Sequence, residues 1–200
     1  MPPDRWRPYG VHFLTDFADQ AVILPLTIAV TVSLLVQRWR RGAAVWLLGV
    51  TATLAITLAL KLVFHACSET FGLPSLHTPS GHAAAAAVIS GGLTGLLSRR
   101  RTAAVLISLA IVTLIGLSRL LLGAHSLPEV VVGSLVGLAG AAVLLRLAGP
   151  PPPGFDLRRT ALVAATVLVL FHGLHMPAEA HIRASASFLA RYFGVCVPPG

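Results

Sequence analysis

Six apolar runs separated by short polar segments constrain this chain more than any other feature of its sequence. A helix needs about 20 apolar residues, within a range of roughly 17 to 25, to cross the hydrocarbon core of a bilayer. Because an open sheet cannot satisfy its backbone polar groups in lipid, we expect each run to form a helix. The runs are Ala21–Val36, Ala43–Phe64, Ala83–Leu97, Thr102–Leu117, Leu127–Ala148 and Thr160–Leu174. The sequence therefore predicts an all-α, polytopic transmembrane helical bundle of about six spans, with five and seven left open.

The composition excludes an ordinary soluble domain. Apolar residues make up 56% of the 200 residues and charged residues 11%, whereas a soluble domain carries about 25% charged residues. The net charge of +8 does not indicate nucleic acid as a partner, because the arginines lie in short clusters between the apolar runs. The first run begins only near Ala21, with no charged head and short apolar core before it, so we expect no cleavable signal peptide.

The basic residues alternate between the two sides of the predicted membrane. Nine of the fifteen follow the first and third runs or flank the Pro150–Gly154 linker after the fifth: Arg38, Arg40, Arg41, Arg99, Arg100, Arg101, Arg146, Arg158 and Arg159. The positive-inside rule places these segments in the cytoplasm, and it places His65–Thr78, Ser118–Ser126 and both termini on the other face. A composition rich in Arg, Ala and Leu with a single lysine points to a GC-rich bacterium. We therefore expect a protein of the bacterial cytoplasmic membrane whose outer face meets the periplasm or exterior.

The chain divides into three parts by composition. We expect residues 1–20 to form an N-terminal interfacial segment, 21–175 the transmembrane bundle and 176–200 a C-terminal extracytoplasmic tail. Val11–Asp19 and His181–Phe193 mix apolar and polar residues at helical spacing. Each is either a short amphipathic helix in the membrane interface or a loose end.

Small residues recur within two of the runs. Gly91 and Gly95 are four apart in the third run, as are Gly133 and Gly137 in the fifth. Glycines at this spacing let two helices approach closely, which predicts tight packing inside one bundle rather than a dimer face. The oligomeric state stays open.

The segment Thr78–His82 opens the alanine-rich third run on the outer side. Thr78 suits an N-cap and Pro79 suits the first position of a helix. Ser80 and Gly81 then offer unpaired backbone N–H groups, and Gly81 has no side chain to obstruct a ligand. A helix start of this kind binds anions, phosphate above all.

Two basic residues lie at the outer ends of predicted helices. Lys61 lies near the outer end of the second run, and Arg119 follows Ser118 after the fourth, with His125 six residues further on. Either side chain can simply extend to the interface. However, ionisable groups near membrane depth mark functional sites, and a guanidinium fork with an ammonium suits the two charges of a phosphate monoester.

Taken together, these residues resemble the signature of the type 2 phosphatidic acid phosphatase superfamily, in its membrane lipid phosphatase branch. That signature is K-x6-RP, then PSGH, then SR-x5-H-x3-D, and the match here runs from Lys61 through Pro79–His82 to Ser118–Glu129. The resemblance implies a membrane hydrolase that removes phosphate from a lipid phosphate or pyrophosphate through a phosphohistidine, without metal or cofactor.

The resemblance also implies a role for each matching residue. His125 attacks phosphorus, and His82 protonates the leaving oxygen as general acid. Glu129 holds the His125 ring in the right tautomer, as the acid of a catalytic triad does. The groups that bind the phosphoryl oxygens and stabilise the transition state are Lys61, Ser80, Gly81 and Arg119.

Two positions depart from the family's pattern. Ser68-Glu69 stands where the family has Arg-Pro, so one phosphate ligand is missing, and His65 or His77 is placed to replace it. Glu129 stands where the family has Asp. The stretch Ser126–Glu129 also has the pattern of a capping box that opens the fifth run, and both roles of Glu129 can hold together.

The cysteines leave the compartment open. Cys67 and Cys196 are the two cysteines of the chain, too few for a disulfide framework or a four-cysteine zinc site. In an oxidising compartment they could pair and tie the tail over the outer segments, and otherwise they stay free thiols. A metal site built from His65, Cys67, His77 and His82 lacks the usual zinc spacings, so we expect no metal.

A non-enzymatic protein is the alternative. A lipid-binding or transport protein could retain the fold without activity, and the missing Arg-Pro favours this reading. The presence of both His82 and His125 favours an enzyme, because binding alone needs neither a nucleophile nor an acid. Which lipid phosphate is the substrate does not follow from the sequence.

Overall fold

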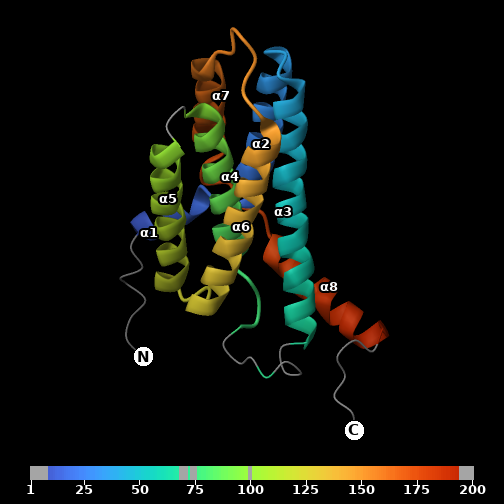
Figure 1. Ribbon diagram of the computed structural model, residues 1–200. Coiled ribbons are helices and arrows are strands. Elements are labelled where there is room, and N and C mark those ends of the chain that lie inside the picture. The colour runs from blue at the N-terminus through green and yellow to red at the C-terminus, as the bar shows by residue number, and fades with distance from the viewer. Residues whose placement is uncertain (1–8, 68–71, 73–75, 99–100, 194–200) are drawn as a thin grey trace.

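The chain folds into an all-α bundle in the computed structural model, which describes residues 9–67, 72, 76–98 and 101–193 (Figure 1). Within these residues there are eight helices and no strand. The helices are α1 (Tyr9–Asp16), α2 (Gln20–Val36), α3 (Arg40–Cys67), α4 (Gly81–Leu97), α5 (Arg101–Leu121), α6 (Leu127–Ala148), α7 (Leu157–Phe171) and α8 (Ala178–Phe193). The prediction of an all-α bundle is confirmed, and the six apolar runs coincide with α2 to α7.

Four helical stretches are long and apolar enough to cross a membrane. They are Gly10–Val36, Arg40–Cys67, Thr102–Leu121 and Leu127–Ala148. Helix α4 is apolar but has only 17 residues, and α7 has 15. The long helices therefore set the thickness of the bundle, while the two shorter ones pack against them.

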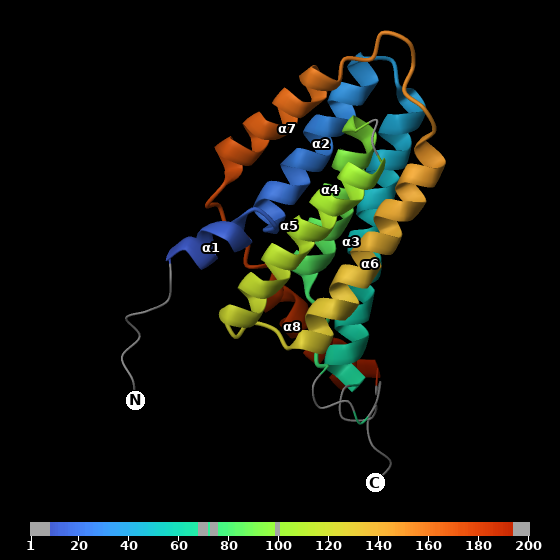
Figure 2. The same ribbon diagram turned by 60° about the vertical axis from the view of Figure 1, so that its left-hand side comes forward.

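Helix α4 lies at the centre of the bundle and contacts α3, α5 and α6 (Figures 1 and 2). A central helix has no lipid-facing side, which explains why its first turns consist of the small, buried residues Ala83–Ala87. Small side chains let three neighbours approach one short helix. The start of α4 is thereby held among the ends of the surrounding helices.

Two glycines of α6 allow its backbone to touch that of α4. A Cβ atom at Gly133 would overlap the carbonyl oxygen of Ser80, and one at Gly137 would overlap the carbonyl oxygen of Ala84. The predicted tight packing inside the bundle is therefore confirmed for this pair. It fixes the first turn of α4 against the first turns of α6.

The sequence left open whether the segments before and after the bundle form helices or loose ends. In the structure the first contains helix α1 and the second contains helix α8. Helix α1 packs on α5, and α8 packs on α3. In Figures 1 and 2, α8 lies at the end of the bundle where α3 ends, α4 begins and the α5–α6 turn is found. Cys67, the last residue of α3, is buried and disulfide-bonded, so a free thiol at this position is excluded. The other cysteine, Cys196, lies outside the described residues.

We expect Gly137→Ala and Gly133→Ala to lower the thermal unfolding temperature of the detergent-purified protein, because the added methyl group meets backbone atoms that cannot move aside. Overpacking of this kind costs about 1–3 kcal/mol. Gly10→Ala is the matched control, since a Cβ at Gly10 has nothing within 4 Å. Equal unfolding temperatures for all three variants would contradict the close α4–α6 contact.

Candidate phosphoryl-transfer site

Ionisable side chains from four helices meet at the end of the bundle that α8 covers. Lys61 comes from α3, His82 from the first turn of α4, Arg119 from the last turn of α5 and Glu129 from the first turn of α6. The charges of Lys61, Arg119 and His125 all act on His82, so these side chains lie close together. The structure thus gathers residues that are far apart in the sequence into one cluster.

The α5–α6 turn presents His125. Gly123, at φ +63°, ends α5 in the left-handed conformation, and the N–H groups of Gly123 and Ala124 bond back to Leu120 and Arg119 at 2.9 and 3.0 Å. These two bonds form a Schellman motif, which stops a helix sharply. Since α6 begins two residues after His125, the histidine lies on a turn that is fixed from both sides.

The Glu129 carboxylate connects three parts of the site. Its Oε1 accepts hydrogen bonds from the backbone N–H groups of His77 and Thr78 at 2.9 and 2.8 Å. Its Oε2 accepts from the N–H of Ser126 at 3.0 Å and lies 2.9 Å from Nδ1 of His125. The capping reading and the histidine-orienting reading of Glu129 therefore hold together in the structure.

The hydrogen bond to Glu129 determines which nitrogen of His125 is reactive. An ionised carboxylate only accepts hydrogen bonds, so Nδ1 carries the proton and Nε2 keeps its lone pair. Burial lowers the pKa of His125 below its ordinary value of 6.5; the positive charges of Lys61 and Arg119 act in the same direction, and the Glu129 bond opposes them. The neutral ring, which is the nucleophilic form, is therefore favoured near neutral pH.

The start of α4 differs from the sequence prediction. Ser80, not Thr78, is the N-cap, and its Oγ accepts from the N–H of Ala83 at 3.4 Å. Thr78 instead donates its N–H to Glu129, and the N–H of Ser80 bonds to the carbonyl of Glu129 at 2.9 Å. The prediction of Thr78 as the N-cap is wrong because the sequence does not show its long-range hydrogen bond to Glu129.

The corrected cap leaves two backbone donors at the helix start. Among the described residues, neither the N–H of Gly81 nor that of His82 has a hydrogen-bond acceptor. The N–H of Ser80 is occupied, so only its hydroxyl proton remains for a ligand. A Cβ on Gly81 would lie 3.3 Å from Cε and 3.6 Å from Nζ of Lys61, so the lysine reaches over this helix start.

Arg119 is the second cation of the cluster. Its Nη1 donates to Oγ1 of Thr15 in α1 at 3.1 Å. Its Nε is buried and has no hydrogen-bond partner within the described part of the chain. A buried donor without an acceptor is costly, and an anion in this cluster would satisfy it.

Three residues that sequence reasoning missed complete the cluster. Asp19, the N-cap of α2, places Oδ2 3.9 Å from Nε2 of His82. Thr15 holds Arg119, as described above. Glu179 in the first turn of α8 forms an ion pair with Lys61. The sequence did contain a signal for the two acids. The chain has only seven acidic residues, so an acid without an assigned role was a candidate partner for one of the basic residues.

Some of the remaining predicted positions lie within the described residues and others lie outside them. Ser68 and Glu69, which replace the family's Arg-Pro, lie outside the described residues. His65 lies in the last turn of α3 and His77 is exposed, and neither is shown to take the missing place. The described residues contain no group of three His, Cys, Asp or Glu that could hold a metal ion.

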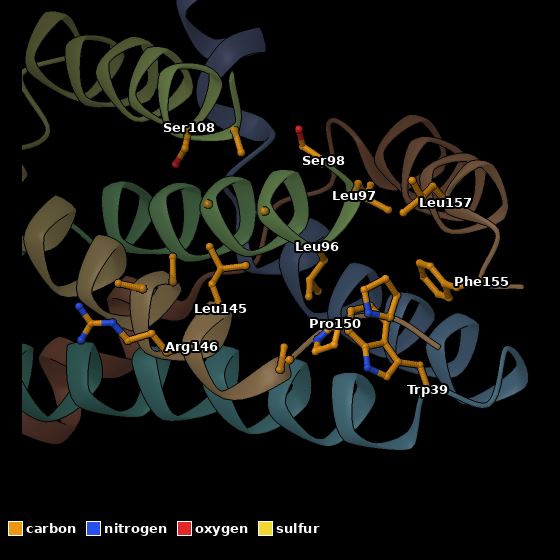
Figure 3. A pocket seen from close by; sticks show the side chains of 18 of the residues that line it. Trp39, Leu96, Leu97, Ser98, Ser108, Leu145, Arg146, Pro150, Phe155 and Leu157 are labelled. Carbon is orange, nitrogen blue, oxygen red and sulfur yellow. The ribbon is translucent and has the colours of Figure 1, made fainter. Parts of the chain in front are cut away.

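A cavity of about 1230 Å³ lies at the opposite end of the bundle (Figure 3). Trp39, Leu96, Leu145, Arg146 and Phe155 are among the residues that line it. None of the clustered ionisable residues takes part. Its walls are mostly apolar, and no histidine, cysteine or acidic residue is among the residues that line it.

The fold and this cluster define a membrane-type helical bundle in which a histidine hydrogen-bonded to an acid lies at the same end as the start of α4. The family model described as the PAP2 superfamily matches residues 46–150, which contain Lys61, His82, Arg119, His125 and Glu129. The chain belongs to the PAP2 superfamily, and this membership indicates a phosphatase.

One curated relative extends the match beyond the site. An uncharacterised 22.5 kDa protein in the cps region of Klebsiella pneumoniae is 32% identical over 173 residues, which cover 80% of this chain and 82% of the relative. No solved structure matches the chain.

We expect Glu129→Gln to reduce turnover by about 10²- to 10⁴-fold, by analogy with loss of the triad acid in serine proteases. It should also lower the unfolding temperature, because an amide offers one acceptor oxygen where the carboxylate serves three N–H groups and a histidine. Glu129→Asp keeps the charge and should retain more activity than Gln. Phosphate release and thermal unfolding measure the two effects.

Asp156→Asn is the control for this test. Asp156 caps α7 by accepting from the N–H groups of Arg158 and Arg159, at the end of the bundle away from the cluster. Its loss should cost stability without changing turnover of the folded protein. A Glu129→Gln protein that behaves in the same way would show that Glu129 is a cap and no more.

Proposed function

We propose that this protein is an integral membrane lipid phosphatase that hydrolyses a lipid phosphate or pyrophosphate through a phosphohistidine on His125. The hydrogen bond of 2.9 Å between His125 Nδ1 and Glu129 Oε2 carries the proposal. It directs the lone pair to Nε2, beside two cations whose charges act on the ring. A site made only for binding has no need of an oriented, neutral imidazole.

The reaction has two displacement steps. His125 Nε2 forms a bond to phosphorus as the bond from phosphorus to the lipid oxygen breaks, and His82 gives that oxygen its proton. Water then attacks the phosphohistidine and passes its proton to His82, and inorganic phosphate leaves as the P–N bond breaks. Lys61, Arg119, the Gly81 N–H and the Ser80 hydroxyl stabilise charge on the phosphoryl oxygens in both steps. These groups need no metal or cofactor.

A lipid fits the position of the site. The cluster lies at one end of long apolar helices, where a substrate whose tail is in the bilayer presents its head group. The lipid-phosphate part of the proposal rests on this position. Phosphatidic acid, phosphatidylglycerol phosphate, undecaprenyl pyrophosphate and isoprenoid phosphates all have the required chemistry.

The active site faces the periplasm or exterior in this proposal. The connections that carry Arg38, Arg40, Arg158 and Arg159 lie at the other end of the bundle (Figure 1), as the positive-inside rule requires of a cytoplasmic side. The disulfide-bonded Cys67 lies at the site end, and disulfides persist in oxidising compartments. Both observations favour the same orientation in a bacterial cytoplasmic membrane.

We expect the purified protein to release phosphate from at least one lipid of this panel without added metal, and His125→Ala to reduce release by about 10⁴-fold or more. Quenching with an alkaline denaturant, which preserves the acid-labile P–N bond, should trap a phosphoenzyme from phosphorus-labelled substrate in the parent protein and none in His125→Ala. His82→Ala should form the intermediate more slowly, most of all with poor leaving groups. His181→Ala, an exposed histidine of α8, is the control and should behave like the parent protein. Full activity in His125→Ala would disprove the mechanism, and phosphate binding without turnover would favour the non-catalytic alternative.

Cysteine labelling in intact cells tests the orientation. Ala124 lies exposed in the α5–α6 turn and Pro151 lies exposed in the α6–α7 connection. Ala124→Cys should react with a membrane-impermeant thiol reagent above the level of the parent protein, and Pro151→Cys should react only after the cells are lysed. The reverse pattern would overturn the proposed topology.

A further inference from the structure

The ion pair between Lys61 and Glu179 has no counterpart in the phosphatase chemistry described above. Glu179 belongs to α8, the helix that packs across α3 at the site end. The Lys61 side chain is 5% exposed, whereas that of Glu179 is 40% exposed. Lys61, the buried cation proposed to bind substrate, is therefore already paired with Glu179, a partly exposed acid.

Glu179 lies among the phosphate-binding groups and not only beside the lysine. Its charge acts on Arg119, and it also interacts with His125. Lys61 itself reaches over the start of α4 at Gly81. The carboxylate thus lies within range of the same groups that would surround a phosphoryl group.

The electrostatic balance keeps Glu179 charged. Burial acts to raise its pKa, but the hydrogen bond and charge of Lys61 outweigh burial and hold the pKa below its ordinary value of 4.5. The acid is therefore a carboxylate at neutral pH. Its oxygen is an anionic acceptor for Lys61, as a phosphoryl oxygen of the substrate would be.

We propose that Glu179 is an internal competitor of the substrate phosphate: it holds Lys61 in the resting enzyme, and the phosphoryl group must displace it. This inference rests on the proposed phosphatase site and adds a residue that sets affinity. A phosphate monoester carries close to two negative charges and displaces a single carboxylate. When inorganic phosphate leaves, Glu179 returns to the lysine.

The competitor weakens the binding of every phosphate compound, and a substrate held by the membrane tolerates this best. Displacing Glu179 costs every phosphate compound the same free energy. A lipid offsets this cost because its tail keeps the head group at high local concentration near the site, whereas free phosphate has no second anchor. Glu179 therefore limits inhibition by inorganic phosphate, including the product of the reaction itself.

The test is Glu179→Gln, which keeps the shape of the side chain and removes its charge. Because phosphate no longer has to displace a charged partner from Lys61, we expect the inhibition constant of inorganic phosphate and the KM of the lipid each to fall about tenfold. The value of kcat should change little or decrease as product release slows. Asp156→Asn, which also removes one negative charge but at the other end of the bundle, should leave both constants unchanged.

A binding measurement separates this inference from the proposed function. Calorimetric titration with inorganic phosphate is made on His125→Ala and on His125→Ala/Glu179→Gln, neither of which needs to turn over. Tighter binding by the double variant supports the competitor even if no substrate is found. In a Lys61→Ala background the Glu179→Gln effect should disappear, because the two residues act through each other.

The opposite result has a definite meaning. If Glu179 instead positions Lys61 for substrate, Glu179→Gln weakens phosphate binding and raises KM, which overturns the proposal. Unchanged binding in both Glu179→Gln and Glu179→Ala overturns it as well. Thermal unfolding of each variant confirms that the folded protein is being compared.

Discussion

The Glu129 carboxylate is the interaction on which the site depends. It binds the backbone before α4 through His77 and Thr78, the start of α6 through Ser126, and the ring of His125. One buried side chain therefore fixes the anion-binding helix start, the turn that holds the histidine and the tautomer of that histidine. In a low-dielectric environment such hydrogen bonds to a charged group are strong, and they are costly to leave unmade.

The packing of α4 makes this arrangement possible. Glu129 reaches His77 and Thr78 only because Gly133 brings α6 into contact with the backbone of Ser80. The alanines of α4 serve the same end, since larger side chains would push α3, α5 and α6 outward. The small residues of the core and the charged residues of the site therefore depend on each other. Close contact between the backbones of α4 and α6 places the polar groups together at one end of the bundle.

Local patterns predicted the helices, and long-range contacts account for what was missed. The apolar runs predicted the helices correctly because lipid requires long apolar helices. The motif residues Lys61, His82, Arg119 and His125 indicated the family. The cap at Thr78 was wrong because Glu129, 51 residues away, takes its N–H. The partners Asp19 and Glu179 could not be assigned, because only the folded chain brings the start of α2 and the start of α8 against the site.

Within the described residues, the cluster holds donors without acceptors, Arg119 Nε and the N–H groups of Gly81 and His82, around a histidine hydrogen-bonded to an acid. The central claim is that these groups surround a pentavalent phosphoryl group bonded to His125. An experimental structure of the protein with vanadate, which adopts that trigonal-bipyramidal geometry, tests it most directly. We predict vanadium bonded to Nε2 of His125, with its oxygens on Arg119 and the start of α4. Vanadate bound elsewhere, or held without a bond to His125, would contradict this account.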